Sequence, residues 1–312
     1  MKIICAGLMV CDMIAKPIDR KIFSYDSIRL DSFQIATGGD ALNVALNLSK
    51  LKINVMMVGR VGNDINGNFL IEALEKHGVD PTNVIRTSQL NTAVSIAMVD
   101  SAGERRFAYF GGANDSFDER DVSDDLLKKA KILFIGSAFG MHGLEAENLE
   151  NLCRRAKENG LEVILDVTSN PSARQMVTIK KVLPYVDVFI PSQDEAASLT
   201  GVSEIPEAAE KFSELGGKTI VIKAGAAGCY VRDGVDKGYI SAVKTNVIDT
   251  TGAGDAFVSG YIYGLTKSFS AFECARLGTI MGARCVSGLG ATESTPYEDD
   301  LMKTYNRNLA VP

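Results

Sequence analysis

Short, wholly apolar runs recur along the chain between segments that have helical periodicity. The runs are Ile3–Ala6, Val55–Val58, Ile132–Ile135, Val163–Leu165, Val188–Ile190 and Ile220–Ile222. Runs of this kind are typical of parallel strands that are buried on both faces. After the first run, apolar residues instead follow a helical spacing, at Ala41, Leu42, Ala45, Leu48 and Leu51. This alternation predicts an α/β fold, a three-layer α/β/α sandwich around a mostly parallel central sheet.

Two regions depart from the alternation. Thr92–Phe110 predicts a β-hairpin with the turn Ser101-Ala102-Gly103-Glu104. Ser24–Ala36 also predicts extended structure, and its apolar residues change phase between Leu30 and Phe33, which predicts a β-bulge. We expect these regions to form a small β lid, with segments at about residues 13–36 and 91–112. Since no linker or repeat interrupts the sequence, residues 1–312 are predicted to form a single domain with this lid.

Composition and charge narrow the class of protein. The chain is 46% hydrophobic and 23% charged, as in ordinary globular enzymes. Its net charge of −6 argues against nucleic acid or an anionic membrane as the main partner. Six scattered cysteines without a C-x-x-C pair favour reduced thiols in a cytoplasmic protein. Asp12 interrupts the apolar N-terminus, which favours a buried strand over a signal peptide, and no run is long enough to span a membrane.

The segment that predicts chemistry reads Asp249-Thr250-Thr251-Gly252-Ala253-Gly254-Asp255-Ala256-Phe257. The strand-like run Val243–Ile248 precedes it and the helix-like run Ala256–Leu265 follows it. Glycines between a strand and a helix let backbone amides converge on an anion at the helix N-terminus. Asp255, in the first helical turn, could accept the proton of a hydroxyl that attacks a γ-phosphate. The alternative is a glycine-rich turn in which Asp255 only starts the helix.

From the first strand to about Pro296 the chain resembles the ribokinase-like (PfkB) carbohydrate kinase family. Asp249–Phe257 is similar to the family's C-terminal signature. A second segment resembles the family's N-terminal signature. It reads Gly38-Gly39-Asp40-Ala41-Leu42-Asn43-Val44-Ala45, followed by Gly59-Arg60-Val61-Gly62-Asn63-Asp64 and Gly67. The resemblance implies a ribokinase-like fold and an ATP- and Mg²⁺-dependent kinase that phosphorylates a hydroxymethyl group of a sugar or sugar acid. It also suggests a homodimer formed through the lid.

The resemblance assigns roles to individual residues. Asp255 would be the general base, beside an anion site made by Gly252, Ala253 and Gly254. The sugar would be bound by Asp12, Gly38, Gly39 and Asn43. Helical periodicity independently places Asp40, Asn43 and Asn47 on one face, opposite the apolar stripe. For Asp40 and Asn47 the alternative is a solvated face.

The resemblance also implies a nucleotide site. The loop Lys223-Ala224-Gly225-Ala226-Ala227-Gly228 resembles the family's nucleotide loop, so Lys223, Gly225 and Gly228 are predicted to bind ATP. The resemblance assigns Thr250 to the same site. Ser192-Gln193-Asp194-Glu195 falls where the family often has Asn-x-x-Glu, an element tied to magnesium and phosphate. Ser192 departs from the usual asparagine and Glu195 fits. Thr279 aligns with an asparagine that relatives place near the adenine.

A monovalent cation, potassium, is a further implication of the resemblance. It would lie beside the anion site and be held mainly by backbone carbonyl groups. The residues concerned are Asp249, Thr251, Cys285, Gly288, Gly290 and Ser294.

The hairpin carries two adjacent arginines, Arg105 and Arg106. Alternation along a strand sends their side chains to opposite faces. Arg106 lies deeper in the strand, so we expect it to face the sugar cleft and Arg105 to face water. A guanidinium in the cleft would favour an acceptor with a carboxylate or several hydroxyls. The alternative is that both charges are solvated.

Two other enzyme classes are excluded because the chain lacks their sequence motifs. Gly217-Lys218-Thr219 mimics the end of a phosphate-binding P-loop, but Phe212 replaces its first glycine and a strand follows. A dinucleotide-binding enzyme would need G-x-G-x-x-G where this chain has Gly7–Asp12. A nucleoside kinase of the same fold and a non-catalytic sugar-binding regulator remain as alternatives.

Overall fold

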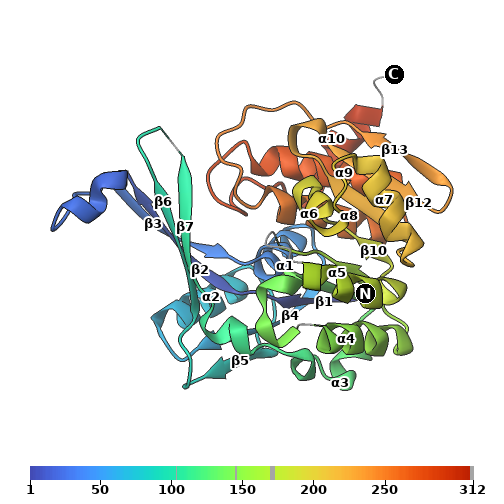
Figure 1. Ribbon diagram of the computed structural model, residues 1–312, viewed down its shortest axis with the longest axis horizontal. Helices are drawn as coiled ribbons and strands as arrows, with labels where there is room; N and C mark the ends of the chain where they lie inside the picture. The colour runs from blue at the N-terminus through green and yellow to red at the C-terminus, as the bar shows by residue number, and fades with distance from the viewer. Residues whose placement is uncertain (103, 145, 169–172, 310–312) are drawn as a thin grey trace.

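The computed structural model describes residues 1–102, 104–144, 146–168 and 173–309 (Figure 1). The strands of its main sheet are β1 (Lys2–Gly7), β4 (Asn54–Gly62), β5 (Val84–Thr87), β8 (Ile132–Gly136), β9 (Glu162–Leu165), β10 (Val188–Phe189), β11 (Thr219–Lys223), β12 (Cys229–Asp233) and β13 (Asp236–Ile240). Their order across the sheet is β13-β12-β11-β10-β9-β8-β1-β4-β5. The strands from β5 to β11 pair in parallel, and β12 and β13 extend that edge antiparallel. All six predicted strands are confirmed, while β5, β12 and β13 were not predicted.

Helices cover both faces of this sheet, as the three-layer prediction requires (Figure 1). Alternate residues of β1 show the division, because Ile3 and Cys5 face one buried cluster and Ile4 and Ala6 face the other. The first cluster is covered by α1 (Asp40–Lys50), α2 (Ile65–Lys76), α8 (Ala253–Thr266) and α9 (Ala271–Cys285). The second is covered by α3 (Asp124–Leu127), α4 (Glu147–Glu158), α5 (Ala173–Val182), α6 (Gln193–Thr200) and α7 (Ile205–Glu214). α10 (Glu298–Leu309) packs on α9.

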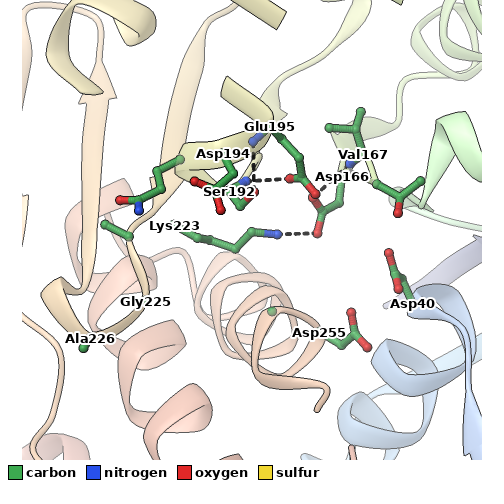
Figure 2. Close-up of a pocket in the computed structure, with 14 residues that line it drawn as sticks. Asp40, Asp166, Val167, Ser192, Asp194, Glu195, Lys223, Gly225, Ala226 and Asp255 are labelled. Atoms are coloured by element: carbon green, nitrogen blue, oxygen red, sulfur yellow. Dashed lines mark hydrogen bonds and ion pairs between the residues drawn. The ribbon is translucent and has the colours of Figure 1, made fainter. Parts of the chain in front are cut away.

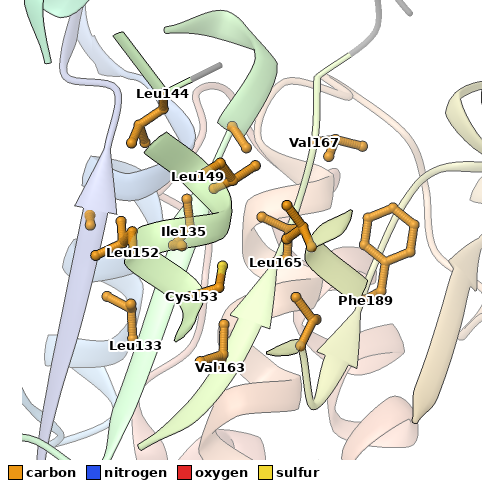
Figure 3. Packing of buried hydrophobic residues seen from close by; sticks show 14 of the residues in the cluster. Leu133, Ile135, Leu144, Leu149, Leu152, Cys153, Val163, Leu165, Val167 and Phe189 are labelled. Carbon is orange, nitrogen blue, oxygen red and sulfur yellow. The ribbon is translucent and has the colours of Figure 1, made fainter. Parts of the chain in front are cut away.

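The second cluster shows how a helix is fixed to the sheet. Leu149, Leu152 and Cys153 of α4 pack against Val163 and Leu165 of β9 (Figure 3). Their spacing of three and four residues puts them on one helical face. Burying a leucine side chain of this kind contributes about 1.5–3 kcal/mol. Short 3₁₀ turns connect the larger elements: η1 (Arg20–Ser24), η2 (Gly112–Ser116), η3 (Glu119–Asp121), η4 (Ala138–Gly140), η5 (His142–Leu144), η6 (Leu183–Tyr185) and η7 (Gly225–Ala227).

A second sheet forms the predicted lid. Its strands are β2 (Val10–Lys16), β3 (Ser32–Gly38), β6 (Ala93–Val99) and β7 (Arg105–Phe110), in the order β3-β2-β6-β7. The β6–β7 hairpin confirms the prediction, although Gly103 of its turn lies outside the described residues. The predicted bulge is wrong, because β2 and β3 pair without interruption from Val10 with Gly38 to Lys16 with Ser32. The phase change falls before β3 begins.

The strand predicted at Val243–Ile248 is also wrong. The described backbone from residue 241 to 248 has no strand pairing, and the sheet edge ends with β13. Val243 and Val247 instead line a pocket beside Phe257. An apolar run can therefore form the wall of a binding pocket as well as a buried strand.

The lid leaves apolar side chains exposed on one face. The strand pairing places Ile35, Met13 and Ile96 side by side, with Phe33 next along β3. Phe33, Ile35 and Ile96 are all exposed. The homodimer expected through the lid stays a prediction. Within the described part of the chain, no helix combines the length and apolarity needed to cross a membrane.

Candidate active site

The polar residues of the main sheet collect at the carboxyl ends of its parallel strands. Asp166 follows β9, Ser192 follows β10, and Lys223 ends β11. In open parallel sheets this edge is where ligands bind. Together with Asp40 and Asp255, these residues line a cavity of about 580 Å³ (Figure 2).

Asp255 lies in the first turn of α8, which begins after Gly252 in the left-handed conformation (φ 73°). Its carboxyl group is buried, and Oδ2 accepts a hydrogen bond from Nδ2 of Asn43 at 2.8 Å. The amide oxygen of Asn43 is also buried and has no hydrogen-bond partner in the structure. Asn43 therefore orients the carboxyl of Asp255 and retains one acceptor for a hydroxyl group.

A second carboxyl group changes the protonation of Asp255. Burial raises the pKa of Asp255, and the charge of Asp40 raises this pKa further, against the hydrogen bond from Asn43. Asp40 accepts a hydrogen bond from the hydroxyl of Ser137, and burial raises the pKa of Asp40 as well. Figure 2 shows both carboxyls on the same side of the cavity. A carboxylate with a raised pKa is a stronger base than an ordinary aspartate.

The opposite side of the cavity holds a buried ion pair between Lys223 and Asp166, with Nζ and Oδ2 2.6 Å apart (Figure 2). Burial raises the pKa of Asp166 to about 7, although Lys223 lowers it. Burial lowers the pKa of Lys223, but Asp166 and Glu195 more than offset this and raise it. A Cβ on Gly254 would lie 3.6 Å from the Lys223 ammonium, so this cation stands beside the anion-binding turn.

Asp166 was not predicted from the sequence to be a residue of the site. The available signal was its position directly after the buried run Val163–Leu165, at the ligand-binding edge of a parallel sheet.

Ser192 and Glu195 cap the first turn of α6. The Ser192 hydroxyl accepts from the amide of Glu195, and the Glu195 carboxylate accepts from the amide of Ser192 at 2.7 Å. This capping box leaves Glu195 at the cavity wall, next to Asp194. Among the described residues no cluster of three potential protein ligands could hold a metal ion. One or two carboxylates together with the phosphates of a nucleotide do fit Mg²⁺, which usually keeps several waters.

A second pocket, of about 630 Å³, opens from the first. The two share Lys223, Gly225, Ala226 and Gly254 in their walls. Apolar side chains form much of the second pocket, including Val243, Val247, Phe257 and Val286. The structure brings the predicted nucleotide residues Thr250, Gly225, Gly228 and Thr279 together here.

Asp249 ties together the two loops that flank the start of α8. Its carboxylate accepts from the amides of Thr251 at 2.8 Å and Gly290 at 3.1 Å. It also forms an ion pair with Arg105 of the lid at 2.8 Å. Burial raises the pKa of Asp249, but these three partners hold it at about 2.

The remaining residues of the predicted cation loop lie close to Asp249. The thiol of Cys285 donates to the carbonyl groups of Thr251 at 3.3 Å and Ala291 at 3.4 Å. Ser294 packs beside Gly288, because a Cβ on that glycine would overlap the serine hydroxyl. A monovalent cation at this loop stays a prediction, and the Asp249 carboxylate is already paired with Arg105.

The lid carries Asp12 close enough to Asp40 for the two carboxyl groups to interact. Asp12 pairs with Ala36 and Ser95 in the lid sheet, and its carboxylate occupies the space that a Cβ on Gly38 would need, 2.3 Å from Oδ2. Gly39 is the N-cap of α1. Burial raises the pKa of Asp12 to about 6, with a further contribution from Asp40.

Two orientations predicted from the sequence are wrong. Arg106 points away from the site, with its side chain 68% exposed and Nη1 3.8 Å from Oε2 of Glu104. Arg105 is the inward residue, because strand pairing puts it on the lid face that carries Asp12 and Tyr109. The alternative of a solvated face is excluded for Asn47. It is fully buried and accepts a hydrogen bond from the hydroxyl of Thr295 at 2.7 Å.

Comparison with known proteins agrees with this geometry. The pfkB family carbohydrate kinase profile matches residues 1–298. A protein from Archaeoglobus fulgidus, described as an uncharacterized sugar kinase, is 31% identical over 255 residues, which are 82% of this chain and 100% of that protein. An ATP-dependent 6-phosphofructokinase from Thermoanaerobacterium thermosaccharolyticum is 26% identical, over 97% of this chain and 94% of the relative.

A solved structure is also similar. Arabidopsis thaliana ribokinase, complexed with ribose and ATP, superimposes with a TM-score of 0.85 and 25% identity, covering 97% of this chain and 98% of that one. The shared fold and the profile match over nearly the whole sequence lead to one conclusion. This chain belongs to the PfkB family of carbohydrate kinases.

Proposed function

We propose that this sugar kinase transfers the γ-phosphate of ATP to a hydroxymethyl group of a neutral sugar, with Asp255 as the general base. The observation that carries the proposal is the position of Asp255. It stands at the N-terminus of α8, in the acidic cavity, next to the wall that this cavity shares with the apolar pocket. A nucleotide in the apolar pocket would direct its phosphates past Lys223 and Gly254 toward this carboxylate.

The chemistry follows from that arrangement. Asp255 takes the proton of the acceptor hydroxyl as its oxygen bonds to the γ-phosphorus, and the bond from that phosphorus to ADP breaks. The amides at the start of α8 and the Lys223 ammonium stabilise the charge that develops on the phosphoryl oxygens. Bound Mg²⁺ would neutralise further phosphate charge, with Asp194 and Glu195 available as carboxylates. Residues 1–312 act as one catalytic unit with the lid.

The charge of the acceptor side favours a neutral substrate. Asp40 and Asp255 line the cavity, Asp12 approaches from the lid, and Lys223 is the one lysine or arginine among the described lining residues. Lys223 is already paired with Asp166. A carboxylate or phosphate on the sugar would meet uncompensated repulsion, whereas sugar hydroxyls can donate to these carboxylates. Arg106 points away from the site and the inward Arg105 is paired with Asp249, so neither guanidinium gives a reason to expect a sugar acid.

A nucleoside is the second candidate acceptor. Phe107 and Tyr109 are exposed on the inner face of the lid, on the same face as Asp12. Flat aromatic side chains there could stack on a nucleobase. Potassium beside Asp249 stays a prediction, since Arg105 supplies one positive charge at that carboxylate.

The first test replaces the proposed base. Asp255→Asn should lower kcat by roughly 10²–10⁴-fold because the amide cannot accept the proton. Binding of ATP, measured by calorimetry, should persist because the anion-binding amides remain. A variant with a kcat near that of the wild type would refute the assignment. Asp125→Asn, at an exposed position that pairs with Lys128, is the control.

The pH dependence supplies a second test. Asp255 works as a base only when deprotonated, so kcat/KM should fall as the pH drops through its pKa. Since that pKa is raised, the acidic limb should lie above the ordinary aspartate value of about 3.9. Asp40→Asn removes a charge that raises this pKa, so the limb should move to lower pH. An acidic limb at the same pH in Asp40→Asn would show that the charge of Asp40 does not affect the pKa of the base.

Two glycines of the anion-binding turn provide a matched pair. Gly252 has a positive φ, and a Cβ there would lie 2.4 Å from Cβ of Ala291. Gly252→Ala should therefore destabilise the protein by about 1–3 kcal/mol and also lower kcat. A Cβ on Gly254 meets only the Lys223 ammonium at 3.6 Å. Gly254→Ala should keep the melting temperature and lower kcat, and normal kinetics would show that this amide surface is not used.

The acceptor can be identified by a thermal-shift screen of neutral sugars, sugar acids, sugar phosphates and nucleosides. A ligand at 100 times its Kd adds about 2.7 kcal/mol to the free energy of unfolding. We expect a neutral sugar to stabilise the protein most and then to support ADP release with stoichiometric sugar phosphate. Stronger stabilisation by an anionic sugar would contradict the charge argument. A sugar that binds without ATP turnover would instead indicate a non-catalytic regulator.

A further inference from the structure

Two adjacent arginines at the tip of the lid have opposite surroundings. The Arg105 side chain is 28% exposed, and it donates to the Asp249 carboxylate at 2.8 Å and to the Thr251 hydroxyl. The Arg106 side chain is 68% exposed and lies 3.8 Å from the equally exposed Glu104. Only Arg105 therefore connects the lid with the main body of the protein at this point.

The contact made by Arg105 falls on the turn that would bind phosphate. Asp249 holds the amides of Thr251 and Gly290, so it fixes the loops on both sides of the start of α8. The Asp249 carboxylate is only 3% exposed. Removing one partner of such a buried pair leaves a charge without compensation, which is strongly unfavourable. The arrangement of the turn thus depends on a residue carried by the lid.

The same face of the lid reaches the acceptor. Asp12 and Tyr109 both pair with Ser95, so the three lie in one row across the sheet. Arg105 lies four residues before Tyr109 on β7, about 13 Å along the same face. One sheet therefore contacts the acceptor side with Asp12 and the phosphate side with Arg105. A displacement of the sheet changes both contacts together.

We propose that Arg105 is a positioning residue that fastens the lid to the phosphate-binding turn, so that lid closure over the acceptor and the catalytic arrangement of the turn occur together. The inference rests on the proposed function and assigns this coupling to one side chain. Arginine suits the role because its guanidinium can donate to a carboxylate and a hydroxyl at the same time. Both contacts are made by Nη1, so a lysine keeps the positive charge but places it on a more flexible stem without the rigid planar group.

The experiment compares Arg105→Ala, Arg105→Lys and Arg106→Ala, using the acceptor found in the screen. Arg105→Ala should lower kcat roughly 10- to 100-fold, as expected for loss of a hydrogen bond to a charged group. It should also raise the acceptor KM and the fraction of ATP hydrolysed without sugar phosphate, because the site is no longer closed to water. Arg105→Lys, which keeps the positive charge, should recover part of the kcat that Arg105→Ala loses. Arg106→Ala should match the wild type in every measurement.

A readout without substrate separates this inference from the proposed function. Arg105→Ala should speed amide hydrogen exchange in the peptides that cover Thr251–Asp255 in the ligand-free protein, and Arg106→Ala should not. If the wild type phosphorylates none of the acceptors, the proposed function fails while this exchange difference still tests the contact. Equal exchange in the two alanine variants, or equal kcat and equal ATP loss, would overturn the role of Arg105. If Arg105→Ala lowers the melting temperature but leaves kcat, the acceptor KM and the fraction of ATP hydrolysed unchanged, Arg105 has only a structural role.

Discussion

As the proposed base, Asp255 must have a carboxyl group that is both buried and basic, and the proposed site depends on this constraint. Burial favours the neutral acid of Asp255, and Asp40 opposes its charge as well. Three features work against these effects: the hydrogen bond from Asn43, the Lys223 ammonium, and the positive end of α8. Each comes from a different part of the chain, and the fold brings them together. The net effect is a raised pKa for Asp255, so its carboxylate is a stronger base than an ordinary aspartate.

The fold meets this constraint through its layers. α1 carries Asn43 and α8 carries Asp255, and both helices pack on the same face of the main sheet. Lys223 arrives from the carboxyl end of β11. These three elements are widely separated in sequence, so the site exists only when the sheet order is complete. The buried apolar cluster beneath them therefore supports the proposed site, since it fixes the distance between the amide donor of Asn43 and the carboxylate of Asp255.

Features set by neighbouring residues in the sequence could be predicted, whereas features set by contacts between distant segments could not. The strands that are buried on both faces were predictable because their apolar runs are local. The run Val243–Ile248 has the same local pattern, yet it lines a pocket, since composition does not say whether a strand has a partner. Alternation correctly placed Arg105 and Arg106 on opposite faces, but which face meets the cleft depends on pairing with β6. Asp166 was missed because a single acid after a strand becomes meaningful only beside Lys223.

The path of the chain explains why Asp12 and Asn43, the proposed acceptor ligands, both lie next to the lid. The chain leaves the main sheet after Gly7 and enters the lid at Val10, and it returns through Gly38, the pairing partner of Val10. The amide of Leu42 in α1 donates to the carbonyl of Leu8 at 3.4 Å, so the two crossing points are held side by side. Asp12 lies just beyond one crossing and Asn43 just beyond the other. Both proposed acceptor ligands therefore lie near this junction, whereas Arg105 lies at the tip of the lid. A rotation of the lid about this junction would move Arg105 farther than Asp12.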